Sequence, residues 1–420
     1  FHQLVEFNRR QTRLKMEEVA WQALKGHVAR LILVMIRVDN SPRDYAWGSL
    51  TDIAELRGMT PSGKPEAELW LGTHPGSPTQ IVDPANAAGS ATIADFLAAR
   101  GEQPLPYLLK VLAAAHPLSI QAHPSPEQAR EGFARENAAG IALDAPNRNY
   151  RDDAHKPELI YALSDTFEAL CGFRDVEQTI SELESLAAAN ALACSPTSAL
   201  AEFTAQLSQR GEGAIRWALD WALTGDNASA LVAEISQAGK LVKDSLLIEL
   251  AEDYPGDPGI VVALLLNRVT LTQGQALYLP AGNMHAYIRG LGIELMAASD
   301  NVLRGGLTSK HVDVPELLSV VSDKVVPVPI LKPRNVAPGI DLFAPDVPDF
   351  VLAHVEVSSK TSESDTLSLT RHAIVTCTSG NVTLRGSESF LELSRGENAF
   401  ISAEEQAISF SGAGELFIAL

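Results

Sequence analysis

The sequence predicts a mainly β protein with one block of helices inserted between two β regions. Short apolar runs separated by prolines fill residues 36–120, which is typical of short strands and turns. Apolar residues recur at helical spacing from residue 175 to residue 250, and alternating short strands resume after residue 255. Because 420 residues exceed one small barrel, we expect two or three domains.

Composition excludes several classes of partner. The net charge of −19, from 52 acidic and 33 basic residues, argues against a nucleic-acid partner. The three cysteines are widely spaced and form no C-x-x-C pair, which indicates a reducing, cytoplasmic location. No apolar run approaches the roughly 20 residues of a membrane helix, so we expect no membrane association. We expect a monomer or a weak homo-oligomer.

Local signals define the elements of the first β region, residues 36–174. Residues 1–35 are an N-terminal extension to which the sequence assigns no role, and their mixed charges do not fit a targeting peptide. Thr92 is the expected cap of a short helix. Residues 105–115 form a buried strand around Lys110, and Ser125, Pro126 and Gln128 open another helix.

Breaker clusters mark the later boundaries. We expect a helical insertion at residues 175–254, and the cluster at residues 254–259 returns the chain to β structure, so that residues 255–325 complete the first β domain. Prolines between residues 327 and 338 lead into a C-terminal β domain, residues 326–420.

Residues 274–285 read G-Q-A-L-Y-L-P-A-G-N-M-H. This pattern predicts a strand, a tight turn set by Pro280 and Gly282, and an inward-facing His285. It resembles the second signature half of a cupin, a jelly-roll β-barrel that holds a metal with inward-facing side chains. The matching positions of the C-terminal domain are Ser402 and Ala407, so we expect a second, metal-free cupin-like barrel there.

Three segments offer ligands that would complete a metal site. Gln121 and His123 are two residues apart and face the same side of a strand. Glu158 precedes an apolar run, and His285 supplies a second imidazole. A lone histidine is more often structural, but nitrogen plus hard oxygen without thiolate suits zinc with open positions.

The chain resembles the zinc-dependent type I phosphomannose isomerases from about residue 39 to residue 318. Six motifs in this order carry the resemblance: D-Y-A-W-G at 44–48, A-E-L-W-L-G-T-H-P at 67–75, L-S-I-Q-A-H-P at 118–124, H-K-P-E at 155–158, P-A-G-N-M-H-A-Y at 280–287 and D-N-V-L-R-G-G-L-T at 300–308. The C-terminal domain matches only loosely.

The resemblance implies one zinc ion per chain, held by Gln121, His123, Glu158 and His285. It also implies that Arg304 is catalytic. The implied reaction interconverts mannose 6-phosphate and fructose 6-phosphate by proton transfer between C1 and C2 through an enediolate. Gln121 replaces the histidine of many cupins, and the distant Glu158 replaces their usual glutamate.

Further residues receive roles from their surroundings. Lys110, Lys156, Arg304, Lys310 and the Ser119 hydroxyl are candidate phosphate donors, against the alternative of solvated surface charges. A lysine within the apolar residues 108–112 needs a partner, which favours function for Lys110.

More than one group in the sequence could carry the proton between C1 and C2. Glu294 is the candidate base, or instead a partner that holds a ligand in place. Asp300 would orient Arg304 or Lys310, His155 would assist ring opening, and Tyr287 would line the sugar pocket. Trp47, Trp70 and His74 are interpreted as structural.

Two other classes compete with a phosphorylated-hexose isomerase. A non-catalytic sugar-phosphate-binding cupin, acting as a sensor or regulator, would need neither Arg304 nor all four ligands. Another metal-dependent cupin enzyme, such as an iron oxygenase or an epimerase, would usually use two histidines and one carboxylate. The intact set that includes Gln121 and Arg304 favours the isomerase.

Overall fold

The computed structural model describes residues 35–358, 361, 364–387 and 389–420. Residues 1–34 of the expected extension therefore lie outside the described residues. Within the described ranges, no helix combines the length and the apolar character that crossing a membrane requires.

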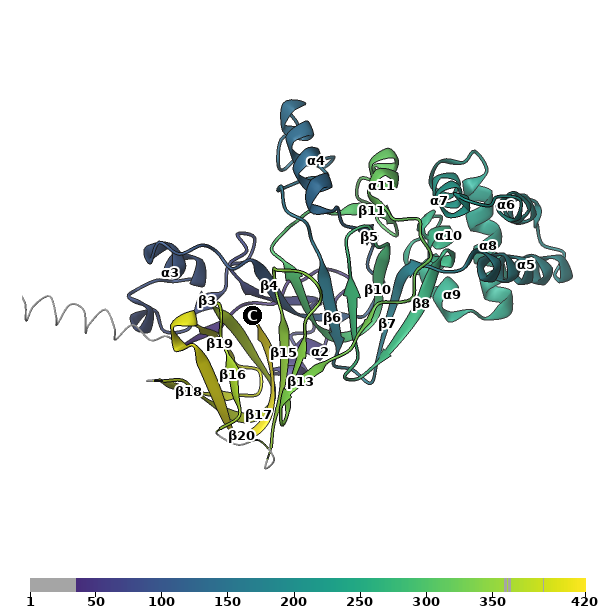
Figure 1. The fold of residues 1–420 in the computed structure, drawn as a ribbon. Coiled ribbons are helices and arrows are strands. Elements are labelled where there is room, and N and C mark those ends of the chain that lie inside the picture. Colours follow the sequence, from purple (N-terminus) through teal and green to yellow (C-terminus); the bar gives the residue numbers. More distant parts are fainter. Residues whose placement is uncertain (1–34, 359–360, 362–363, 388) are drawn as a thin grey trace, which may run out of the picture.

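Two ten-stranded sheets dominate the molecule, which confirms the mainly β class (Figure 1). The first sheet contains β2 (Glu68–Gly72), β4 (Tyr107–Ala114), β5 (Ile120–Ala122), β6 (Glu158–Ala162), β7 (Thr166–Phe173), β8 (Leu266–Thr272), β9 (Ala276–Leu279), β10 (His285–Ala297), β11 (Leu303–Gly306) and β12 (Ile330–Leu331). The second contains β1 (Met35–Asp39), β3 (Gln80–Ile81), β13 (Arg334–Ala337), β14 (Ile340–Phe343), β15 (Leu352–Val357), β16 (Thr366–Ser368), β17 (Ala373–Arg385), β18 (Phe390–Ser394), β19 (Asn398–Ile401) and β20 (Ala407–Ala419).

The two sheets are the expected cupin-like domains, although neither closes on itself through strand pairs of the described residues. The long strand β10 explains how the first sheet still encloses a site. Its first half pairs with β5 and β7, and its second half pairs with β4 and β6. The partners change at Gly290, where φ is 133° and an added Cβ would lie 2.8 Å from Phe167. The strand β10 therefore connects these two pairs of strands within the first sheet.

The helices begin where local chemistry predicts. The Thr92 side chain accepts a hydrogen bond from Asp95 at the start of α3 (Ile93–Ala99), and Ser125 and Gln128 form a capping box on α4 (Pro126–Ala138). The short helix α2 (Asp52–Leu56) precedes both. The expected helical block consists of α5 (Val176–Leu192), α6 (Ser198–Ser208), α7 (Ala214–Thr224), α8 (Ala228–Val242) and α9 (Ser245–Asp253), at one end of the first sheet (Figure 1).

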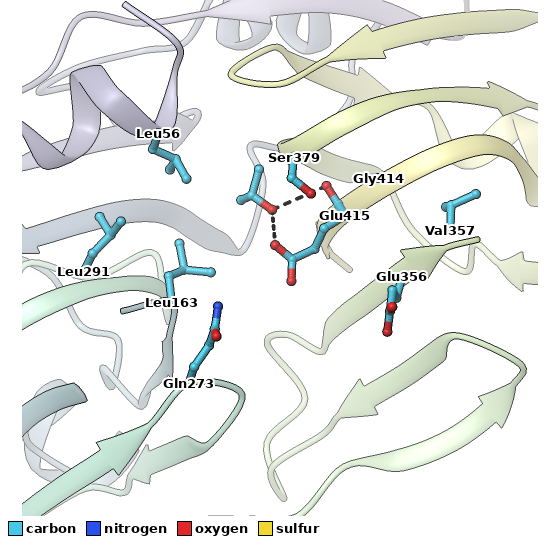
Figure 2. A pocket seen from close by; sticks show the side chains of 10 residues that line it. Leu56, Leu163, Gln273, Leu291, Glu356, Val357, Ser379, Gly414 and Glu415 are labelled. Atoms are coloured by element: carbon cyan, nitrogen blue, oxygen red, sulfur yellow. Dashed lines mark hydrogen bonds between the residues drawn. The ribbon is translucent and has the colours of Figure 1, made fainter. Parts of the chain in front are cut away.

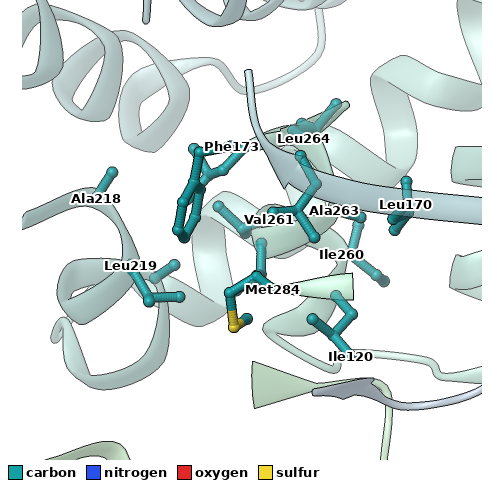
Figure 3. Close-up of a cluster of buried hydrophobic side chains, with 14 of the residues drawn as sticks. Ile120, Leu170, Phe173, Ala218, Leu219, Ile260, Val261, Ala263, Leu264 and Met284 are labelled. Carbon is teal, nitrogen blue, oxygen red and sulfur yellow. The ribbon is translucent and has the colours of Figure 1, made fainter. Parts of the chain in front are cut away.

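One expectation about this region is wrong. The chain does not return to β structure directly after residue 259, because Gly259–Leu264 forms the buried helix α10. A short apolar run does not distinguish a buried helix from a buried strand. Figure 3 shows α10 residues Ile260, Val261 and Ala263 in the apolar cluster that also holds Met284. The helical block therefore packs directly behind His285.

The two β domains share one apolar core. Phe343, Phe350 and Phe417 of the C-terminal domain lie in the same buried cluster as Leu109 and Leu159 of the first sheet. The strands β1 and β3 belong to the C-terminal sheet, since β1 pairs with β19 and β3 pairs with β1. The domain boundaries drawn from the sequence remain a prediction, but the shared core fixes the relative position of the two sheets.

Candidate metal centre

Three neighbouring strands bring the expected ligands together. Gln121 on β5 is the register partner of His285 on β10 and of Arg304 on β11. His123 follows β5, and Glu158 begins β6. The predicted turn positions the next strand, because Gly282 adopts φ 75° and its N–H donates to the His123 carbonyl at 2.8 Å. Residues far apart in sequence therefore converge on one point.

His123, Glu158 and His285 form a compact, buried cluster. Their potential ligand atoms all lie within 4.8 Å of one another. Each imidazole Nε2 is 3.2 Å from a Glu158 oxygen, His123 from Oε1 and His285 from Oε2. Each of the three side chains is only 1% exposed, so water does not compete for these atoms.

The backbone fixes the tautomer of both imidazoles. His123 Nδ1 lies 2.7 Å from the Asn301 carbonyl, and His285 Nδ1 lies 3.0 Å from the Asn283 carbonyl. A carbonyl only accepts, so each neutral ring carries its proton on Nδ1 and turns the Nε2 lone pair toward the carboxylate. Both Nε2 atoms and Glu158 Oε2 lack a hydrogen-bond partner. Buried lone pairs that face one another fit a bound cation.

Charge around the cluster keeps the donors in their metal-binding forms. Burial alone would raise the pKa of Glu158, but the charge of Lys156, with Nζ at 2.7 Å, holds that pKa well below its usual value. Burial lowers the pKa of His123 to about 4. Neutral imidazole and carboxylate are donors that zinc prefers, and the Gln121 amide lies beside them in the strand register.

Next to the cluster are three cations without a carboxylate partner among the described residues. Arg304 and Lys310, both expected site residues, are accompanied by Arg151, which the sequence analysis missed. Burial lowers the pKa of Arg304, and the nearby charge of Arg151 lowers it further. Burial and the charges of Arg304 and Arg151 lower the pKa of Lys310. Uncompensated positive charge of this kind marks a site for an anion.

Lys110 forms ion pairs with two carboxylates. Its Nζ lies 2.8 Å from Glu294 Oε2 and 3.2 Å from Glu68 Oε1, and it stands over the Trp70 ring at 5.3 Å. Burial opposes its charge, but Glu294 and Glu68 raise the pKa of Lys110. Burial raises the pKa of Glu294. Burial also raises the pKa of the buried Tyr287, and the nearby charges of Glu294 and Glu158 raise it further. Lys110 is thus the centre of a buried charge network.

Two expected residues have partners that the sequence did not indicate. Asp300 bonds to His74 at 3.0 Å rather than to Arg304 or Lys310, and His155 bonds to Asp349 at 2.8 Å. The Gly76 N–H donates to His74 Nδ1, so His74 Nε2 carries the proton that reaches Asp300. Burial would raise the pKa of Asp300, but this bond keeps it lowered. The hydroxyl of Ser119, just before β5, has no hydrogen bond to a described residue.

The buried Asn301, also missed, organises this edge of the site. Its Nδ2 donates to the carbonyls of Asp152 and Ala154 at 2.9 and 2.8 Å, and its Oδ1 accepts from the Arg151 N–H at 2.7 Å. Because its own carbonyl accepts from His123, Asn301 ties the loop of Arg151 and His155 to an expected metal ligand.

Known proteins resemble this chain over almost its whole length. Family models of the type I phosphomannose isomerase catalytic domain and the mannose-6-phosphate isomerase cupin domain match residues 35–176 and 340–420. The chain is 40% identical over 403 residues to the mannose-6-phosphate isomerase of Escherichia coli, covering 91% of this chain and 98% of the relative. The human enzyme is 32% identical, with 86% and 92% covered. A crystal structure of mannose 6-phosphate isomerase bound with zinc and yttrium is similar, with a TM-score of 0.77, 36% identity and coverage of 92% and 99%.

Proposed function

Because this chain belongs to the type I phosphomannose isomerases, we propose that it interconverts mannose 6-phosphate and fructose 6-phosphate at the His123–Glu158–His285 cluster. The observation that carries the proposal is the pair of imidazole Nε2 lone pairs turned toward one buried carboxylate without a proton between them. Such an arrangement is costly unless a cation occupies it.

One zinc ion per chain fits this donor set, with Gln121, His123, Glu158 and His285 as ligands. Bound zinc would polarise the sugar oxygens as a Lewis acid. The remaining work falls to the protein. Lys156 balances the charge of Glu158, and Asn301 holds His123 in the tautomer that presents Nε2.

The phosphate of the substrate is best placed at the cations that lack carboxylate partners. Arg151 and Lys310 are assigned to the phosphate end, and Arg304, the register partner of Gln121, is assigned to the end next to the metal centre. Ser119 precedes β5 and adds a hydroxyl donor. Lys110, paired with two glutamates, serves the buried network instead.

Proton transfer between C1 and C2 needs a general base, and a carboxylate with a raised pKa suits that role. Glu294 meets this requirement, since burial raises its pKa while Lys110 stabilises its ionised form. Asp300, held by His74, and His155, held by Asp349, transfer the hydroxyl protons of the sugar, and Tyr287 forms part of the pocket wall.

The three cysteines are free, in keeping with a cytoplasmic protein. We also propose a monomer or weak homo-oligomer.

A coupled assay tests this function directly. Zinc-loaded protein should convert mannose 6-phosphate but not free mannose, because only the phosphorylated sugar engages the cations. Chelation should abolish turnover, and added zinc should restore it. Full activity in the metal-free protein would refute the proposed role of the metal. A protein that binds the sugar phosphate without turnover would instead be a sensor.

Arg151→Ala should raise the KM for mannose 6-phosphate about tenfold or more and change kcat less than about threefold. The change removes one charge-assisted hydrogen bond to phosphate, worth about 1.5–3 kcal/mol, far from the reacting carbons. Steady-state kinetics measures the separation of the two constants. Arg130→Ala on the exposed surface of α4 is the matched control. An unchanged KM for the Arg151 variant would remove this residue from the phosphate site.

A further inference from the structure

A carboxylate of the C-terminal β domain contacts the loop that carries Arg151 and His155. His155 Nε2 lies 2.8 Å from Asp349 Oδ2, and the two side chains are only 18% and 19% exposed. The two residues are 194 positions apart in the sequence, and Asp349 comes just before β15. The pair therefore joins the C-terminal β domain to the segment that leads into Glu158.

His155 is held in place from both sides. The carbonyl of Ala154 accepts from Asn301 Nδ2 at 2.8 Å, and Lys156 Nζ lies 2.7 Å from Glu158 Oε1. The residues flanking His155 are thus tied to the metal centre, and Asp349 is the hydrogen-bond partner of its ring among the described residues.

Asp349 is itself rigidly placed. Arg371 Nη1 donates to the carbonyls of Asp349 and Pro348 at 2.7 and 3.0 Å. The next residue, Phe350, is buried in the core that both domains share, and Val351 exchanges two backbone hydrogen bonds with Leu420. The carboxylate is therefore fixed before any substrate binds.

We propose that Asp349 is a positioning residue for ring opening of the sugar. Its carboxylate keeps the proton of His155 on Nε2 and leaves the Nδ1 lone pair, which has no hydrogen-bond partner among the described residues, for the substrate. This inference rests on the proposed function.

The imidazole of His155 both accepts and returns the proton in this step. Nδ1 takes the proton from the O1 hydroxyl, and the electron pair left on O1 forms the C1=O1 double bond as the C1–O5 bond breaks. The C1–O5 bonding pair stays on O5, and the imidazole returns the proton to O5. The C-terminal domain, which has Ala407 where the first domain has His285, thereby contributes a residue to the reaction.

Asp349→Asn should lower kcat about 10- to 100-fold, with KM within about threefold and zinc content unchanged. The amide keeps the size of the side chain but removes its charge and also allows the opposite tautomer. Glu415→Gln is the matched control. Glu415 makes a similar contact, 2.9 Å from His354 Nε2, in the same domain, and lines a separate cavity of about 500 Å³ between the domains (Figure 2). That variant should keep its kcat.

Two further readouts separate positioning from general stability. In the His155→Gln background, Asp349→Asn should add less than about a twofold loss, whereas an equal loss in both backgrounds would make Asp349 merely structural and overturn the proposal. Long-range ¹H–¹⁵N spectra of the zinc-loaded, histidine-labelled protein should show His155 as the Nε2–H tautomer, and Asp349→Asn should change that state.

The spectroscopic result does not depend on activity. A wild-type protein without isomerase activity would refute the proposed function, while the tautomer would still report on the Asp349–His155 contact. An unchanged tautomer together with an unchanged kcat would overturn the positioning role alone.

Discussion

Glu158→Gln should leave the protein without tightly bound zinc and should lower kcat at least about a thousandfold. Glu158 contacts both imidazoles and Lys156, so its negative charge is the main attraction for a cation in the cluster. The amide NH2 of the variant could donate to an imidazole Nε2 and satisfy it without metal. Lewis-acid catalysis contributes several kcal/mol, and each 1.4 kcal/mol is about tenfold in rate. Zinc content after gel filtration and the coupled assay measure both effects.

The control for this variant is another buried carboxylate. Glu234 accepts from the N–H groups of Ala199 and Leu200 at the start of α6, in the helical block. Glu234→Gln should lower the melting temperature but keep one zinc per chain, because the helical block supplies no ligand. If the Glu158 variant retained stoichiometric zinc and its kcat, the cluster would not be the metal centre.

Short-range chemistry made much of the fold and the metal cluster predictable. The Thr92 and Ser125 caps, the Pro280–Gly282 turn and the spacing of Gln121 and His123 depend on residues only a few positions apart. Within such spans the backbone leaves few alternatives, so the type of residue largely determines the structure. The apolar residues 260–264 were the exception, because burial on all sides removes the periodicity that separates helix from strand.

Contacts between distant segments could not be predicted in the same way. The contacts of Arg151, His74 and Asp349 form only when distant loops meet, and nothing near each residue in the sequence indicates its partner. The position of Lys110 shows the limit most clearly. Its apolar neighbours correctly indicated a buried charge with a partner, but not that the partners are Glu68 and Glu294 from adjoining strands. Likewise, the pairing of β1 with β19 spans more than 350 residues.

Arg304→Ala should lower kcat about 10²- to 10³-fold and raise KM less than Arg151→Ala does. Arg304 is the register partner of Gln121 and has no carboxylate partner among the described residues, so its charge is free to stabilise the enediolate. Losing one preorganised donor to a developing oxyanion typically costs about 2.7–4 kcal/mol. Steady-state kinetics for the two arginine variants, measured side by side, separates the reacting end from the phosphate end.

The same variant should not be less stable than the wild type. Burial and the nearby charge of Arg151 both act against the Arg304 guanidinium, so its removal relieves repulsion and should keep or raise the melting temperature. Arg304→Lys should recover only part of kcat, since an ammonium lacks the planar fork of donors. If Arg304→Ala lowered the melting temperature together with kcat, the role of Arg304 would be structural. If the variant kept a normal kcat, groups other than Arg304 would stabilise the enediolate.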